Sequence, residues 1–174
     1  MMDFAHNPRR RLLLSAGGGL LLSAALVHRA RAADEVEIAM SGTSNGSNVW
    51  FRPRGLLIHP GQSVRWINKD AGNVHTSTAY HPDNKKVLRI PSQARSWDSD
   101  YLMPGESFSI TLDIPGVYDY FCLPHEHAGM VGRIIVMGEN ISAHPYADTD
   151  SQLPQAAIDR FPAVADILRL TQIE

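Results

Sequence analysis

The chain has 174 residues, of which 44% are hydrophobic and 20% charged, so it suits one globular domain with extensions and is neither fibrous nor disordered in composition. Its formal net charge is −2, but residues 1–32 hold five arginines and one acid, which leaves 11 basic and 17 acidic side chains and a net charge of −6 in the rest. That charge excludes nucleic-acid binding driven by a positive field and favours basic partner surfaces.

The first 32 residues have the three parts of an export signal. Residues 8–11 are basic, residues 12–27 carry no charge, and residues 30–32 form a small-x-small cleavage site. The paired arginines before the apolar run are typical of a twin-arginine signal, and an ordinary secretory signal is the alternative. An uncleaved membrane anchor is a third interpretation, but the run is short for a span. We predict cleavage near Ala32 and export to the periplasm, with no stable membrane span afterwards.

Short segments of alternating apolar residues follow the signal. They lie at residues 36–40, 49–51, 56–58, 63–68, 74–76, 107–114, 117–122 and 131–137, with turn residues between most of them. A polar segment at residues 80–105 is too long for a hairpin loop, and it contains Trp97, Tyr101 and Leu102 as residues to bury. Seven or eight short strands with no helical period predict an all-β sandwich.

Residues 139–174 have a different pattern. Pro154 can begin a helix that runs to Phe161, and Pro162 can begin another that runs to Leu170. We predict a short helical C-terminal extension that packs on the sandwich, and docking of a partner is the alternative. The predicted organisation is an export signal at 1–32, a sandwich domain at 33–138 and an extension at 139–174.

Cys122 is the only cysteine, and His125 and Met130 follow it three and eight residues later. A thiolate, an imidazole and a thioether on one loop are the donors suited to a copper ion that cycles between Cu(I) and Cu(II). A lone thiol outside the cytoplasm is a liability unless it is buried or ligated, which favours a ligand role for Cys122. One more histidine is needed to complete a site with two histidines, one cysteine and a weak axial methionine.

The upstream candidates for this ligand are His59, His75 and His81. His75 is preferred because it follows a Gly-Asn turn at the start of a strand, where it can be held at one end of the sandwich. We expect His59 to lie on the surface and His81 to be solvated, with an alternative-ligand or supporting role open for His81. His127 is a candidate for a pH-sensitive contact beside the site.

Two residues of the loop have competing interpretations. Met130 is either a core methionine or the axial ligand, and the glycines on both sides favour a turn back to the metal. Glu126 would be a hard ligand that favours Cu(II), and we expect it to face solvent. The predicted ligands are therefore His75, Cys122 and His125, with Met130 in the axial position.

The sequence resembles the plastocyanin/pseudoazurin branch of the cupredoxins. The similarity lies in the Cys122–His125–Met130 spacing, in Phe51-x-Pro53, in residues 61–68 followed by His75, and in residues 116–122 and 129–134. It covers most of residues 34–138 and implies a Greek-key β-sandwich with one type 1 (blue) copper ion at one end. It further implies a soluble one-electron carrier.

The resemblance also implies contacts around the metal. The backbone N–H of Thr76 should donate to the sulfur of Cys122, and His125 should present its outer edge to solvent. The residues expected to form a small apolar patch around His125 are Leu123, Pro124, Ala128 and Gly129. Redox proteins would dock there weakly and transiently, with the chain as a monomer. Trp97 or Tyr101 could border this patch, but we expect them to pack in the core.

Two other functions remain as alternatives. A copper-binding or delivery protein would hold the ion without shuttling electrons, but a carrier of Cu(I) would not need the cysteine. An enzyme of this kind would need a second copper site with extra histidines, and Phe121 and Leu123 flank Cys122 in place of histidines. We therefore predict that the chain is not an enzyme.

Overall fold

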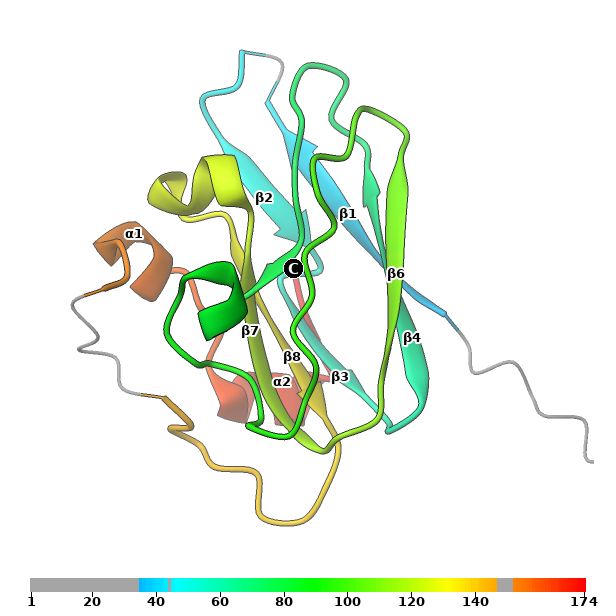
Figure 1. Ribbon diagram of the computed structural model, residues 1–174, viewed down its shortest axis with the longest axis vertical. Coiled ribbons are helices and arrows are strands. Elements are labelled where there is room, and N and C mark those ends of the chain that lie inside the picture. The colour runs from blue at the N-terminus through cyan, green and yellow to red at the C-terminus, as the bar shows by residue number, and fades with distance from the viewer. Residues whose placement is uncertain (1–34, 44, 147–151) are drawn as a thin grey trace, which may run out of the picture.

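The computed structural model describes residues 35–43, 45–146 and 152–174, and the predicted export signal lies outside them. These residues form a two-layer β-sandwich with a few short helices, which confirms the predicted fold class (Figure 1). One sheet has the strand order β2-β1-β4-β6, and the other has the order β5-β7-β8-β3-β9. The strands are β1 (Val36–Gly42), β2 (Val49–Arg52), β3 (Gly55–Ile58), β4 (Gln62–Asn68), β5 (Thr78–Ala79), β6 (Ser107–Leu112), β7 (Gly116–Phe121), β8 (Val131–Val136) and β9 (Gln172–Ile173).

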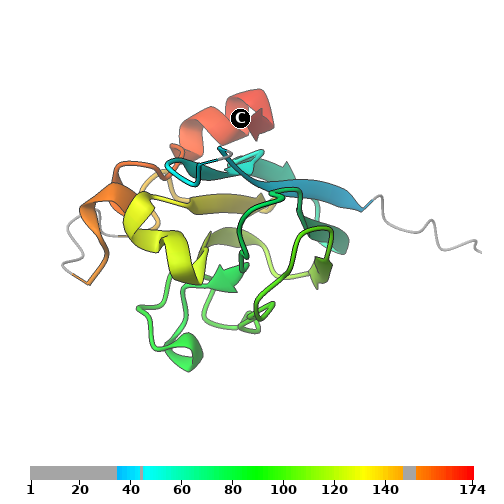
Figure 2. The same cartoon turned by 90° about the horizontal axis from the view of Figure 1, so that it is seen from above.

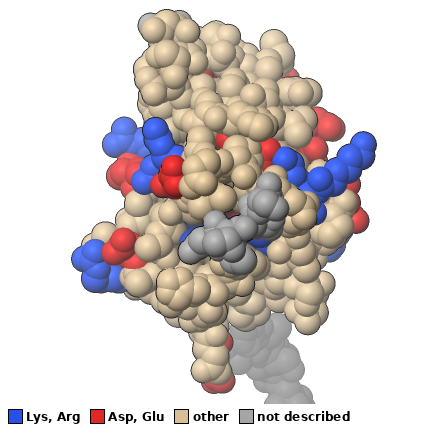
Figure 3. Space-filling view, turned by 90° about the vertical axis from the view of Figure 1, so that its left-hand side faces the viewer, with Lys and Arg blue, Asp and Glu red and all other residues tan. Residues whose placement is uncertain are grey.

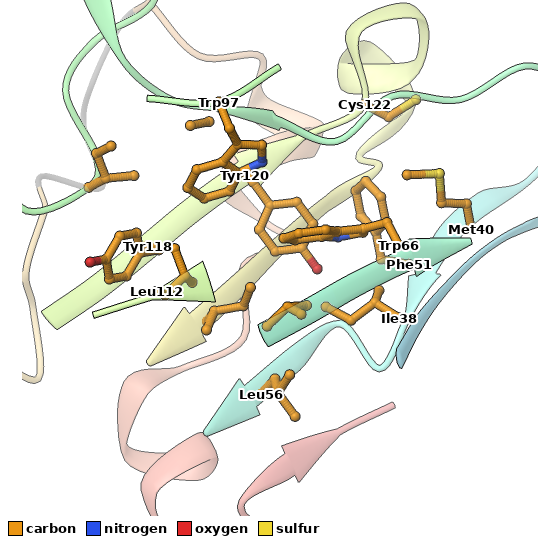
Figure 4. Packing of buried hydrophobic residues seen from close by; sticks show 14 of the residues in the cluster. Ile38, Met40, Phe51, Leu56, Trp66, Trp97, Leu112, Tyr118, Tyr120 and Cys122 are labelled. Carbon is orange, nitrogen blue, oxygen red and sulfur yellow. The ribbon is translucent and has the colours of Figure 1, made fainter. Parts of the chain in front are cut away.

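The core lies between the two sheets and is built from alternating strand residues. Val64 and Trp66 of β4 point inward, as do Tyr118 and Tyr120 of β7, because successive strand side chains face opposite sides. Trp66 is fully buried and meets the ring of Tyr120 edge-on at a centroid distance of 5.2 Å. Figure 4 shows these rings at the centre of the core, with Cys122 at one end. The aromatic packing fixes the end of β7 from which Cys122 projects.

Residues 80–105 pack against the core rather than forming a free loop. Ile90, Trp97 and Leu102 are buried in the main cluster, and the 3₁₀ helix η1 (Pro82–Asn84) lies in the same segment. The backbones of Leu102 and His75 form an isolated β-bridge, so this segment also holds His75. Trp97 packs in the core as expected, whereas Tyr101 is 55% exposed, so the core assignment of Tyr101 is wrong.

The C-terminal extension packs on the sandwich. Its helices α1 (Gln155–Ile158) and α2 (Val164–Leu170) are shorter than the predicted ones, and β9 adds an unpredicted antiparallel strand beside β3. Helix α1 contacts the 3₁₀ helix η2 (Leu123–Ala128), which carries His125. Figures 1 and 2 show α1 beside η2 and α2 against the five-stranded sheet. The extension therefore reaches the loop in which the candidate ligands lie.

A buried ionic network joins these parts. Asp119 of β7 is fully buried and accepts hydrogen bonds from Arg89 of the long segment (2.9 Å) and from Arg133 of β8 (2.7 and 2.9 Å). Arg133 also donates to the carbonyl oxygen of Pro162 at 2.8 Å. Such a network is costly to break because each partner left behind would be a buried unpaired charge. Among the described residues, no helix has the length and apolar character needed to cross a membrane.

Candidate metal centre

Cys122 directly follows β7 and points to the same side as Tyr118 and Tyr120, as the alternation predicted. Its thiol is fully buried, and the backbone N–H of Thr76 donates to the sulfur at 3.3 Å, the contact that the resemblance implied. Burial raises the pKa of the thiol to about 12, although the N–H groups of Thr76 and His125 oppose this shift. The metal-free thiol is therefore protonated near neutral pH, and a metal that binds thiolate must displace that proton.

His75 is held inside the protein at the β-bridge to Leu102. Its Nδ1 atom lies 3.6 Å from the sulfur of Cys122, and its Nε2 atom lies 3.1 Å from Oδ2 of Asp70. Burial raises the pKa of Asp70, but hydrogen bonds from Asn73, Gly72 and His75 outweigh this and hold it below its usual value. Asp70 is therefore a carboxylate that can only accept, so Nε2 carries the proton and Nδ1 presents its lone pair towards Cys122.

Asp70 is itself fixed in place. Its carboxylate accepts from the backbone N–H of Gly72 at 2.9 Å and from the side-chain amide of Asn73 at 2.8 Å, and the residue is 6% exposed. The sequence pattern did not identify Asp70 as part of the site, because an aspartate two residues before a glycine is typical of any turn. Its position five residues before a candidate ligand, in a turn rich in donors, was the available signal.

His125 lies within η2, at the surface end of the site. Its backbone departs from helical geometry (φ −123°, ψ 15°), and this kink brings its Nδ1 atom to 3.4 Å from the sulfur of Cys122. The rings of His125 and His75 have centroids 4.9 Å apart. The side chain of His125 is only partly buried, in agreement with the expectation that its outer edge reaches solvent.

The structure brings three of the four predicted ligands into one cluster. One ligand atom each from His75, Cys122 and His125 lies within 4.8 Å of the others. Among the described residues, these three form the group of metal-ligating side chains that is close enough to hold one ion. Met130 is fully buried in the same core cluster as Cys122. Its N–H donates to the carbonyl of His125 at 3.1 Å, and its own carbonyl accepts from the N–H of Cys122 at 3.0 Å. The loop thus closes on itself with Met130 beside the cluster.

The other four histidines among the described residues, His59, His81, His127 and His144, lie outside this cluster. His59 and His127 are exposed, and His81 uses Nδ1 to accept the N–H of Asp83 at 3.1 Å, which caps η1. The assignment of His59 to the surface agrees with the structure. His81 is about one-fifth exposed and has a structural role at the start of η1 rather than a solvated one.

The expectation that Glu126 faces solvent is wrong. Glu126 is 4% exposed, and its carboxylate accepts the hydroxyl of Tyr80 at 2.9 Å and pairs with Lys86. Residues 80–86 fold over η2 and supply these donors, a contact between segments about 40 residues apart that local sequence patterns do not reveal. Glu126 joins the ligand loop to the long segment, and its carboxylate is engaged there rather than as a metal ligand.

Gly129 is also buried, so its assignment to the exposed apolar patch is wrong. A Cβ atom at this position would lie 2.7 Å from the carbonyl oxygen of Ala156 and 2.9 Å from Cγ of Arg160. The backbone of Gly129 has φ +78°, a region that favours glycine. Helix α1 therefore closes over this side of the loop, while Leu123, Pro124 and Ala128 stay exposed.

The donor set of this cluster fits copper. A thiolate and two imidazole nitrogens are soft or borderline ligands, which suit Cu(I) and Cu(II) better than they suit Mg²⁺ or Ca²⁺. The nearby carboxylates are already engaged, Asp70 by His75 and Glu126 by Lys86 and Tyr80. Hard oxygen ligands are thus kept out of the cluster.

Comparisons with known proteins agree with this chemistry. Residues 36–137 match the family described as copper binding proteins of the plastocyanin/azurin family. Plastocyanin of Tetradesmus obliquus is 41% identical over 96 residues, which span 55% of this chain but only 63% of that relative. Plastocyanin of Chlamydomonas reinhardtii is 39% identical over 115 residues, which span 66% of this chain and 74% of that relative. A Sinorhizobium pseudoazurin structure superposes with a TM-score of 0.56 at 25% identity, over 76% of this chain and 95% of its own.

Proposed function

This chain belongs to the plastocyanin/azurin family of copper-binding proteins, and on that premise we propose that it is an exported carrier of single electrons between redox proteins. The observation that carries the proposal is the convergence of His75, Cys122 and His125 on one point, with ligand atoms within 4.8 Å of one another. The proposed ligands of a type 1 copper ion are these three residues and, in the axial position, Met130. Copper held there supplies a one-electron couple between Cu(I) and Cu(II).

The surroundings support rapid electron transfer because contacts with the rest of the fold hold the ligand side chains. His75 is fully buried and its ring is anchored by Asp70, and Cys122 is fixed by the N–H of Thr76. The hydroxyl of Thr76 also accepts the N–H of Leu123 at 2.8 Å, which ties the first residue of η2 to the His75 segment. A stiff frame of this kind holds the donor atoms in place when the charge at the site changes.

His125 is the proposed exit for the electron, because its ring combines a place in the cluster with partial exposure. Leu123, which is 46% exposed, Pro124 and Ala128 form an apolar patch around it. On the face shown in Figure 3, charged side chains are sparse over the uppermost part of the molecule. A small apolar patch of this type favours brief, weak contact with a partner over a permanent complex. We propose that the carrier acts as a monomer.

The test of the copper site is spectroscopic. Oxidised, copper-loaded protein should absorb visible light strongly through charge transfer from thiolate to copper, and Cys122→Ser should abolish that absorption. A colourless Cu(II) protein would refute the proposal, as would a spectrum that Cys122→Ser leaves unchanged. A reversible one-electron wave in voltammetry then supports a carrier, whereas its absence favours the copper-delivery alternative.

Export to the periplasm is the second part of the proposal, supported by the basic, apolar and small-residue segments of residues 1–32. The full-length chain should be recovered from the periplasm of a Gram-negative host with a mature N-terminus near Ala33. Replacement of Arg9 and Arg10 by lysine should block export if the twin-arginine route is used, and should leave it intact if the general secretory route is used. Recovery of the uncleaved chain in the membrane fraction would favour an anchor instead.

A further inference from the structure

A small pocket with a mixed polar and apolar lining lies beside the ligand loop, on the side closed by the C-terminal extension. It has a volume of about 160 Å³, far more than one water molecule needs, and Asn48, Arg54, Ala128, Arg160 and Glu174 are among the residues that line it. Ala128 belongs to the apolar patch around His125. The pocket therefore opens at the rim of the proposed docking surface.

Two arginines, Arg54 and Arg160, line this pocket, and neither forms an ion pair within the described part of the chain. The Nε atom of Arg54 is buried and has no hydrogen-bond partner among the described residues. A buried donor that meets no acceptor is costly, so in a native fold such a donor normally meets a water or an ion. Burial, together with the positive charge of Arg160, lowers the pKa of Arg54.

The acidic residue of the pocket does not satisfy these cations. The carboxylate of Glu174 is paired with Arg52 and also accepts from Gln172, so its two oxygens are already engaged. Arg160 and Arg54 are absent from the ion pairs formed within the described residues. The lining thus keeps two cationic groups with free donors.

The fold places the backbone of Arg54 and the side-chain stem of Arg160 beside the pocket. The backbone of Arg54 is held between β8 and β9, because its N–H donates to Ile173 at 2.7 Å and its carbonyl accepts from Arg133 at 2.9 Å. Arg160 follows α1, and its Cγ atom lies against Gly129 of the ligand loop. The backbone that carries Arg54 is therefore ordered before any ligand arrives, which reduces the ordering that binding requires.

We propose that this pocket binds an oxyanion, a carboxylate or a phosphate, between Arg54 and Arg160. Guanidinium groups bind such anions through paired, charge-assisted hydrogen bonds, and both arginines line the pocket. The source of the anion is either a free ion or an acidic side chain of a docked protein. Because the pocket adjoins Ala128, an acidic side chain there would select partners by charge at an otherwise apolar surface.

The test follows the Arg54 Nε–H resonance by NMR in the reduced, Cu(I)-loaded protein, which is diamagnetic. Titration with sodium phosphate at low ionic strength should shift this signal in a saturable manner, with a dissociation constant of about 1 mM or tighter. Arg160→Gln should weaken binding by at least about tenfold, because one charged donor group is lost. The matched control Arg169→Gln removes the same charge from the exposed face of α2 and should leave binding unchanged.

Sodium acetate in a second titration separates the two sources. A saturable shift with both anions supports recognition of partner carboxylates, and a shift with phosphate alone supports a site for free phosphate. The proposal is overturned if neither anion gives a saturable shift, or if Arg160→Gln and Arg169→Gln weaken binding equally. Metal-free protein can be titrated in the same way, so failure of this site is distinct from failure of the electron-carrier proposal.

Discussion

His75 and His125 lie with their ring centroids 4.9 Å apart, yet different parts of the fold hold them. His75 is fully buried, bridged to Leu102 through its backbone and to Asp70 through its ring. His125 lies in a kinked 3₁₀ helix, is partly exposed, and comes from the same short loop as Cys122 and Met130. The centre therefore has an interior half that fixes geometry and a loop half that reaches the surface.

The interior half and the loop half should differ most in how easily added imidazole replaces a histidine ring that has been removed. His125→Gly opens a space at the surface, so external imidazole and Cu(II) should restore the charge-transfer absorption. His75→Gly opens a buried space, so we expect at least about tenfold more imidazole to be needed, a difference of about 1.4 kcal/mol. Absorption titrations measure both.

His127→Gly is the matched control, because His127 is exposed on the same loop but lies outside the ligand cluster. This variant should keep its colour without imidazole. Equal recovery of His75→Gly and His125→Gly would contradict the division into an interior half and a loop half.

The anchoring of His75 is tested by Asp70→Asn, which keeps the size of the side chain but removes its negative charge. Loss of a partner that orients a ligating histidine typically weakens metal binding by about 10- to 100-fold. The loss should be greater for Cu(II) than for Cu(I), because the lost negative charge favours the more positive ion, and the reduction potential should rise. Copper affinity and voltammetry measure the two effects.

Asp113→Asn provides the control for charge alone, since Asp113 is exposed and follows β6 at the end of the strand where Leu112 pairs with Gln62. It should leave affinity and potential close to those of the parent protein. A potential that is unchanged in Asp70→Asn, or changed equally in both variants, would argue against the anchoring role.

The loop half depends on α1, and Gly129→Ala probes that contact. The added Cβ would meet the carbonyl of Ala156 at 2.7 Å, and φ of +78° adds backbone strain, so we expect the free energy of unfolding to fall by about 2 kcal/mol. Gly105→Ala isolates the strain, because Gly105 has φ +87° and a Cβ atom added there would meet no atom within 4 Å. Urea denaturation should show the smaller loss, about 1 kcal/mol, for Gly105→Ala. Equal losses would mean that α1 does not press on the loop.

Local signals in the sequence were enough for the strands and for the ligand spacing. Alternation located β4 and β7, and the order of Cys122, His125 and Met130 identified the loop, because both depend on residues close together in the chain. The burial of Glu126 depends on Lys86 and Tyr80, and the burial of Gly129 depends on α1. These contacts arise only when distant segments meet, so no periodicity in the sequence records them.

The smallest expected difference between the two halves is in how the stability of the metal-free protein depends on pH. Burial lowers the pKa of His75, although the hydrogen bond with Asp70 opposes this, and burial also lowers the pKa of His125. The unfolded chain then binds more protons than the folded one as the solution is acidified. The stability that the neutral rings of His75 and His125 contribute is fully present above the unfolded histidine pKa of about 6.5. It is lost as the pH falls through the lower pKa values of the two rings in the folded protein.

We therefore expect the free energy of unfolding of the metal-free protein to decrease between about pH 7.5 and about pH 5.5. His75→Gln should reduce this decrease more than His125→Gln, because His75 is fully buried and His125 is partly exposed. Urea denaturation at fixed ionic strength measures the slopes of the parent and the two variants. Identical slopes in the His75 and His125 variants would show that both rings leave water to the same extent, and the two halves of the centre would then differ in attachment but not in burial.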